Sequence, residues 1–420
     1  MALKRIFPTL ACCLLAILPG PAAAQKMLIY MDLSQKDHLK AYGIAFQALE
    51  QGLNVEWLLN YRGGSFVMDA TDERVRACRL RGVSFAPIGG ADLTRIYAEI
   101  EAQNMDRVLL EKAPKIAVYT PPDKRPWDDA VTLALQYAEV PYKTLWDEDV
   151  LKRDLDKYDW LHLHHEDFTG QYSKFYSYHM LPWYQEQQAA AEAMARRFNF
   201  PTVPELKKSV AQAIKAFVGR GGFLFAMCSA TETLDIALAA EHADLVAPEY
   251  DHTPMDPDAQ NRLDFSQTLS FENFKLQLNP MVGSFSNIDV NQVNAGKIPT
   301  GPFTLFDFSA KYDPVPTMLT QNHANYIAGF YGLSTSFNKN VLKRTVLVLA
   351  EEAGTSRAKY IHGNFGKGTF TFYGGHDPED EEHLVNDPPT NLALHKNSPG
   401  YRLILNNVLF PAAKKKERKT

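Results

Sequence analysis

The stretch Gly221–Ala240, GGFLFAMCSATETLDIALAA, indicates the fold more clearly than any other part of the chain. Five mostly large apolar residues, Phe223 to Met227, predict a buried strand, and the residues from Ala230 onward have the apolar spacing of a helix. Cys228 and Ser229 stand between the two. A strand that turns sharply into a helix is typical of α/β proteins, and the turn exposes its corner residue at the carboxyl edge of the sheet.

Segments on both sides of this corner alternate in the same way. KIAVYTPP (115–122) and WLHLHH (160–165) predict strands, with a helical pattern between them, and PELKKSVAQAIKAFVGRGG (204–222) predicts a helix that ends in glycine. Strands that alternate with helices of about 10–15 residues predict parallel pairing with right-handed crossovers. We therefore expect an α/β fold, a flavodoxin-like three-layer sandwich with a mostly parallel sheet.

The chain of 420 residues is longer than one core usually organises, so we expect two domains or one large elaborated domain. A basic start, an apolar run and the small residues Ala22–Ala24 predict a signal peptide over 1–24 and a secreted or periplasmic protein. A βαβ-type domain is expected at 25–112. A second α/β domain is expected at 113–412, with a β-rich insertion at about 246–340, before a basic tail at 413–420.

Charge and cysteine content limit the function. The formal net charge of −5 argues against nucleic acid as a partner, and no segment after the signal is apolar for long enough to span a membrane. The sequence leaves the oligomeric state open. Of four cysteines, Cys78 and Cys228 lie beyond the signal. In an oxidising compartment they could form a disulfide, or each could be a small buried side chain.

Cys228 is a candidate nucleophile. The start of a helix carries a positive dipole and backbone N–H groups, which lower the pKa of a thiol and can bind an oxyanion. Ser229 and the residues after it would supply these N–H groups. Glu232, one helical turn further on, is either a helper in catalysis or a carboxylate that caps the helix. The alternative for Cys228 itself is a buried core cysteine.

A base for this thiol is predicted near the C-terminus. TFTFYGGHDPED (369–380) places His376 directly after a strand, where two glycines allow close approach of the backbone. Asp377 or Glu379 could orient the imidazole. The alternative is a surface loop with a solvated acidic run.

The helix that ends in Gly-Gly, the strand–Cys–helix corner and the late segment GKGTFTFYGGH (366–376) together resemble the class I glutamine amidotransferase-like superfamily, including its trehalose-utilisation-like branch. The resemblance covers about 115 to the C-terminus without the insertion. It implies that Cys228 attacks an amide and that His376 is the base. Superfamily glutaminases carry a carboxylate two residues after this histidine, where this chain has Pro378.

The whole chain also resembles secreted proteins labelled asparagine synthetase B. The ATP chemistry of that name requires a cysteine after the initiator methionine and an S-G-G-x-D-S loop. Ala2 stands at the first of these places, and the loop does not occur in the sequence.

Two further groups of residues suggest ligand binding. His164, His165, Glu166, Asp167 and His376 could converge at the sheet edge and bind zinc, although no metal-binding spacing supports this and hydrogen-bonded core histidines are the alternative. Arg62 in NYRGGSF (60–66) could bind a carboxylate or phosphate, or the glycines could simply form a turn.

The leading hypothesis is a cysteine–histidine hydrolase of an amide or acyl bond, with Ser229, Arg62, His164, His165 and Glu166 near the substrate. A non-catalytic protein of the same fold that binds a sugar or an acidic ligand is the alternative, and a zinc hydrolase is the third hypothesis. No cofactor or bound metal is predicted, and the partner is a small molecule or carbohydrate.

Overall fold

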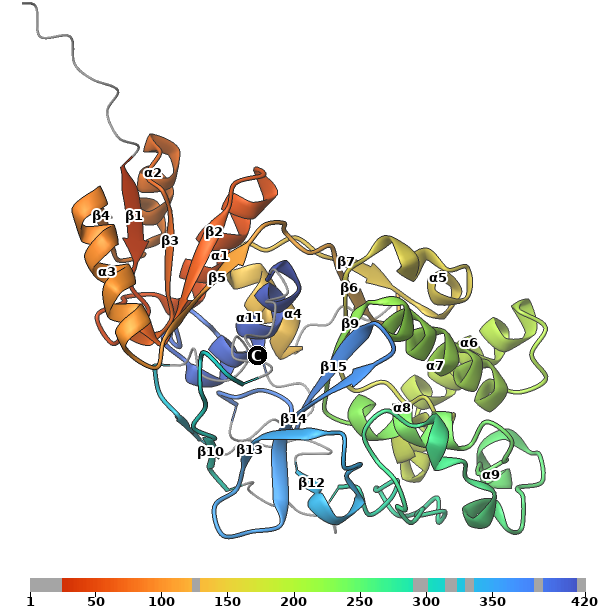
Figure 1. The fold of residues 1–420 in the computed structure, drawn as a ribbon. Coiled ribbons are helices and arrows are strands. Elements are labelled where there is room, and N and C mark those ends of the chain that lie inside the picture. The colour runs from red at the N-terminus through yellow and green to blue at the C-terminus, as the bar shows by residue number, and fades with distance from the viewer. Residues whose placement is uncertain are drawn as a thin grey trace, which may run out of the picture.

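The computed structural model describes residues 25–122, 129–289, 301–313, 323–328, 336–380 and 388–413. The predicted signal peptide, residues 414–420 of the basic tail and parts of the predicted insertion lie outside the described residues. The described part of the chain has a mixed α/β architecture with two sheets, one of five and one of ten strands (Figure 1). Among the described residues, no helix is both long enough and apolar enough to cross a membrane.

The first sheet is antiparallel throughout, so the parallel pairing expected for residues 25–112 is wrong. Its strand order is β4-β1-β3-β2-β5. The strands are β1 (Lys26–Ile29), β2 (Val55–Leu59), β3 (Ser65–Asp69), β4 (Phe85–Ile88) and β5 (Asp106–Leu110). Strands β1 and β2 run in the same direction, but β3 lies between them and pairs with both. The unit is therefore a split βαβ arrangement rather than a pair of neighbouring parallel strands.

A tight reversal after β2 produces this arrangement. The 3-10 turn Tyr61–Gly63 joins β2 to β3, and Arg62, Gly63 and Gly64 all have left-handed backbone conformations, with φ of 46°, 75° and 86°. Glycine adopts such angles without steric cost, so the two glycines favour a reversal here. The sequence SFVMD that follows the glycines then returns as β3 beside both of its partners.

Three helices cover the first sheet: α1 (His38–Glu50), α2 (Asp72–Arg81) and α3 (Gly90–Ala102). The Asp37 side chain caps α1 by accepting the Lys40 N–H, and Thr71 caps α2 by accepting the Arg74 N–H. Helix α3 packs Ile96 and Ile100 on one face of the sheet, whereas α1 packs on the other face.

The second sheet is mixed, so the expectation of a mostly parallel sheet is correct for only part of it. Its strands are β6 (Ile116–Tyr119), β7 (Lys143–Leu145), β8 (Trp160–Leu163), β9 (Phe223–Met227), β10 (Phe303–Leu305), β11 (Tyr326–Ile327), β12 (Phe337–Asn338), β13 (Leu347–Glu351), β14 (Arg357–Phe365) and β15 (Gly368–Tyr373). The run β7-β6-β8-β9-β15 is parallel, as predicted for these strands. Beyond β15, strands β14, β13, β10 and β11 each pair antiparallel with their neighbours, and β14 and β15 form the predicted hairpin at Gly366–Gly368.

Helices lie on both faces of the second sheet. They are α4 (Ala130–Tyr137), α5 (Asp147–Leu151), α6 (Pro182–Arg197), α7 (Val203–Arg220), α8 (Ala230–Ala239), α9 (Pro248–Asp251) and α11 (Pro399–Leu409). Figure 1 shows α4 and α11 in the middle of the molecule, with α1, between the two sheets. One hydrophobic cluster accordingly contains side chains of both sheets, such as Trp57 and Trp160, while α7 and α8 pack with Leu161 and Leu224 on the opposite face.

The insertion is less regular than predicted. Its described part contains the short helix α9, the short strands β10 to β12, isolated bridges, and the 3-10 turns Ala259–Arg262, Phe265–Gln267 and Lys339–Val341. The expectation of a β-rich insertion is therefore wrong for the described residues. The insertion is tied to α8 by Asp235. Its carboxylate accepts the backbone N–H groups of Leu269, Ser270 and Phe271 at 2.7, 2.7 and 2.9 Å.

Candidate active site

The corner between β9 and α8 has an unusual backbone. Cys228 has a φ of 48°, in the left-handed region that residues other than glycine adopt rarely. Its N–H donates to the Gly375 carbonyl at 3.0 Å, and the Ala230 N–H donates to the His164 carbonyl at 3.0 Å. These bonds join the loops that follow β8, β9 and β15. The three strands are parallel neighbours, so their carboxyl ends lie at the same edge of the sheet. A non-glycine residue in this region costs about 1–3 kcal/mol, so the fold holds Cys228 in a strained position.

Cys228 is nearly buried, with 3 % of its surface exposed, and Cys78 is fully buried in α2. The two are not joined by a disulfide, so that alternative is wrong. Burial raises the pKa of the Cys78 thiol to about 12, against a smaller opposing effect of Arg81. Cys78 is therefore a core residue of the first sheet, as predicted, and it has no place in the site.

Four histidines gather on β8 and in the loops that the Cys228 corner joins through its backbone. The rings of His162 and His164 lie on one face of β8 and its extension, 5.8 Å apart, as strand alternation predicts. His165 follows the end of the strand and turns toward its neighbour, with 3.3 Å between the Nδ1 atoms of His164 and His165. The His376 ring packs on the His164 ring with 4.1 Å between centroids. The structure thus brings the predicted base and the histidine-rich strand together.

Asp129 lies beneath this group, and the sequence analysis did not single it out. Its carboxylate contacts His162 Nε2 at 3.0 Å and lies 3.7 Å from His164 Nδ1. It also caps α4 by accepting the Val131 N–H at 2.7 Å. Burial alone would raise the pKa of Asp129, but His162 and the helix N–H groups outweigh burial and lower it. In the sequence, Asp129 stands where a helix begins, which predicts an N-cap but not a contact with the histidines.

The acidic residues predicted to orient His376 have other partners. Asp377 accepts the Tyr401 hydroxyl at 2.6 Å, and burial raises the pKa of this carboxyl group. Glu379 faces His395, with 3.0 Å between its carboxylate and Nδ1.

The other acidic residues predicted for the site accept hydrogen bonds from backbone or hydroxyl groups of the protein. Glu232 accepts the Ser286 hydroxyl of the insertion at 2.5 Å, and Glu166 accepts the backbone N–H of His164 at 3.0 Å. Asp167 accepts the Thr169 and Ser173 N–H groups.

Arg62 lies in the first sheet and is already paired. Its guanidinium donates to the Asp32 carboxylate at 2.7 Å and to the Ser34 hydroxyl at 3.1 Å, and it stacks over the Tyr30 ring. A neutralised guanidinium is a weaker anion receptor than the sequence suggested. All of these contacts belong to the N-terminal segment rather than to the histidine group.

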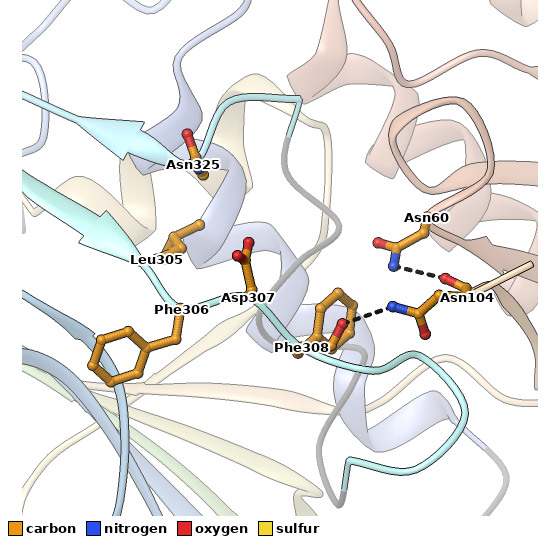
Figure 2. A pocket seen from close by; sticks show the side chains of 7 residues that line it. All are labelled: Asn60, Asn104, Leu305, Phe306, Asp307, Phe308 and Asn325. Carbon is orange, nitrogen blue, oxygen red and sulfur yellow. Dashed lines mark hydrogen bonds between the residues drawn. The ribbon is translucent and has the colours of Figure 1, made fainter.

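A separate hollow of about 450 Å³ lies between the first sheet and the insertion (Figure 2). It is lined by Asn60, Asn104, Leu305, Phe306, Asp307, Phe308 and Asn325. Asn104 holds its two sides together, because its side-chain amide donates to the Phe308 carbonyl at 3.0 Å and its backbone carbonyl accepts from the Asn60 amide at 3.1 Å. Amides, a carboxylate and two aromatic rings are the kinds of group that bind polar ligands such as sugars.

No family model and no curated protein matches the chain. Two cytoplasmic proteins of Salmonella typhimurium of known structure align with 72 % and 71 % of this chain and 100 % of their own, at 11 % and 10 % identity and TM-scores of 0.35 and 0.34. A beta-galactosidase of Bacillus circulans sp. alkalophilus aligns over 68 % of this chain and 31 % of its own, at 11 % identity and a TM-score of 0.25. Similarity at this level does not define a shared fold.

Proposed function

We propose that the protein is a cysteine-dependent hydrolase of an amide or related acyl bond, with Cys228 as nucleophile and His376 as the group that transfers the proton. The observation that carries the proposal is the left-handed conformation of Cys228 at the end of β9. A residue with this backbone at a strand–helix corner projects its side chain from the sheet edge, as nucleophiles do at such turns. The strained backbone has no use in a cysteine that only fills the core, whereas in a nucleophile it positions the sulfur for attack.

The proposed reaction has two steps. The Cys228 sulfur attacks the acyl carbon, His376 accepts the thiol proton, and the leaving amine departs with that proton as the carbon–nitrogen bond breaks. Water then hydrolyses the thioester, which returns the thiol and releases the acid. The Ala230 N–H is occupied by the His164 carbonyl, so we assign the oxyanion to the Ser229 N–H instead.

The order of the parallel strands supports a relation to the glutamine amidotransferase-like superfamily. If the five parallel strands are numbered 1 to 5 as they occur along the chain, their order across the sheet, β7-β6-β8-β9-β15, is 2-1-3-4-5. This is the flavodoxin-like order. Cys228 and His376 both follow strands of this run. In place of a carboxylate two residues after the histidine, His164 packs on His376 and Asp129 lies behind His164. We therefore propose a divergent member in which His164 and Asp129 position the base.

An acyl-enzyme experiment tests the proposal. Intact-mass measurement after incubation with activated esters and with amide substrates should detect one added acyl group, and peptide mapping should place it on Cys228. The Cys228→Ala variant should stay unmodified, while Cys78→Ala should react like the parent protein. Acylation that persists in Cys228→Ala, or none at all in the folded parent, would contradict the proposal.

A binding function is the second candidate, and the hollow in Figure 2 favours it. Asp307 and Asn325 face this hollow together with aromatic side chains, a combination that suits a hydroxyl-rich ligand. Titration with a panel of mono- and disaccharides should then produce saturable binding that Asp307→Ala abolishes and Cys228→Ala leaves unchanged.

We also propose that the protein is exported and that cleavage occurs after Ala24. N-terminal sequencing of protein recovered outside the cytoplasm should begin at Gln25.

A further inference from the structure

We propose that His164, His165 and His376 form a binding site for a divalent transition-metal ion, with zinc as the best match. One ring nitrogen of each residue lies within 4.8 Å of those of the other two. The residues come from the loops after β8 and β15, and the bonds between those loops and the β9–α8 corner fix their separation. Three imidazoles from two anchored loops are a common basis for a zinc site with an open fourth position.

The spacing of the first pair fits zinc directly. Zinc–nitrogen bonds of about 2.0–2.1 Å in a tetrahedron place two ligand nitrogens about 3.3–3.4 Å apart. The Nδ1 atoms of His164 and His165 are 3.3 Å apart. The His376 ring packs on the His164 ring at 4.1 Å between centroids, and one of its nitrogens lies within 4.8 Å of both other ligand atoms.

A deeper group, Asp129, His162 and His164, also has ligand atoms within 4.8 Å of one another. Its members already bind one another and the backbone. His162 uses one nitrogen on Asp129 and the other on the Phe225 carbonyl, and Asp129 caps α4 as well. A metal there would have to break these bonds, whereas in the outer group it would take the place of the hydrogen bond between the Nδ1 atoms of His164 and His165. We therefore assign the metal to the outer group, with the Asp129 carboxylate as a nearby negative charge that favours a cation.

The ligand set differs from the one that the sequence suggested. Glu166 and Asp167 were candidates, but both accept backbone N–H groups in their own loop. His165, the most exposed of the three histidines, gives the ion a route from solvent. Zinc bound to His376 would prevent this imidazole from accepting the Cys228 proton, so the metal-bound protein would be inactive in the proposed hydrolysis. Zinc binding itself does not require the thiol, so its test can be made without the Cys228 sulfur.

The test is a titration of chelator-treated protein with zinc sulfate, in a Cys228→Ala background without a histidine tag, followed by calorimetry and by metal analysis after dialysis. We expect one zinc per chain, and at least tenfold weaker binding in His164→Ala, His165→Ala and His376→Ala. His395→Ala, which removes a histidine outside the group, is the matched control and should bind as the parent does.

His165→Ala is the decisive variant because its side chain is the least buried and its loss should not prevent folding. Cobalt added to the intact protein is a second measurement, since tetrahedral Co²⁺ bound by nitrogen has strong visible absorption. The absence of stoichiometric zinc binding would overturn the proposal. Binding that survives His165→Ala and His376→Ala but is lost in His162→Asn would also overturn it, because the ion would then occupy the deeper group.

Discussion

The strained backbone of Cys228 predicts an unusual response to glycine. Replacing alanine by glycine at a buried position loses about 0.5–1 kcal/mol through the entropy of the unfolded chain and about 0.8 kcal/mol through the lost methyl group. A left-handed backbone destabilises a residue other than glycine by about 1–2 kcal/mol, and glycine has no such penalty. Cys228→Gly should therefore lie within about 0.5 kcal/mol of Cys228→Ala in free energy of unfolding, because the relief offsets most of the loss.

Ala237→Gly is the matched control. Ala237 lies in α8 and is buried with 1 % of its surface exposed, comparable to the 3 % of Cys228, but it has an ordinary helical backbone. Ala237→Gly has the same two losses without the relief, so it should lower the free energy of unfolding by about 1.3–1.8 kcal/mol. The measurement is guanidinium unfolding of each variant, followed by tryptophan fluorescence and by circular dichroism. If the variants share the same dependence of free energy on denaturant, their unfolding midpoints compare their stabilities directly. A Cys228→Gly variant that falls below Cys228→Ala by as much as the control falls would refute the left-handed assignment.

Three other variants test buried polar contacts that stabilise the fold. Arg402→Met should lower the free energy of unfolding by about 2–4 kcal/mol in urea titrations, because the buried guanidinium donates to the Gly63 and Met31 carbonyls and, of these two, only Met31 keeps a second contact, with His38; a loss below 1 kcal/mol would contradict this role. Burial, with a contribution from the Arg402 charge, lowers the pKa of His38 to about 4. The folded state then binds fewer protons than the unfolded state, so stability should fall from about pH 6.5 toward pH 4, and His38→Gln should flatten that decline in a pH series of melting curves. Asp235→Asn should make the insertion more sensitive to limited proteolysis than the core, since one amide nitrogen would face backbone N–H donors of residues 269–271; unchanged cleavage would argue against this anchor.

Local patterns in the sequence predict the elements near the site well. The apolar run Phe223–Met227, the small residues after Cys228 and the Gly-Lys-Gly turn predict β9, the corner and the β14–β15 hairpin, all of which the structure contains. Each of these features depends on neighbouring residues, so short-range chemistry is sufficient to predict it.

Features that depend on distant pairing could not be predicted in this way. Strand β3 inserts between β1 and β2 through a reversal at Gly63, and no local pattern distinguishes that pairing from a parallel βαβ unit. Asp129 has the sequence context of a helix cap and does cap α4, yet its contacts with His162 and His164 arise only when α4 packs against β8. The partner of Asp377 is Tyr401 on the C-terminal helix, another contact that sequence spacing does not reveal.

The most direct test of the proposed function is the pH dependence of Cys228 alkylation by iodoacetamide in a Cys78→Ala background, with the labelled peptide followed by mass spectrometry. If the Cys228 thiol is paired with His376, as we propose, it should react as a thiolate below pH 7, well under the ordinary thiol pKa of about 8.5. His376→Ala should slow labelling there, while His395→Ala should not. Labelling that appears only when the protein unfolds, or that is the same with and without His376, would contradict a paired thiol and imidazole.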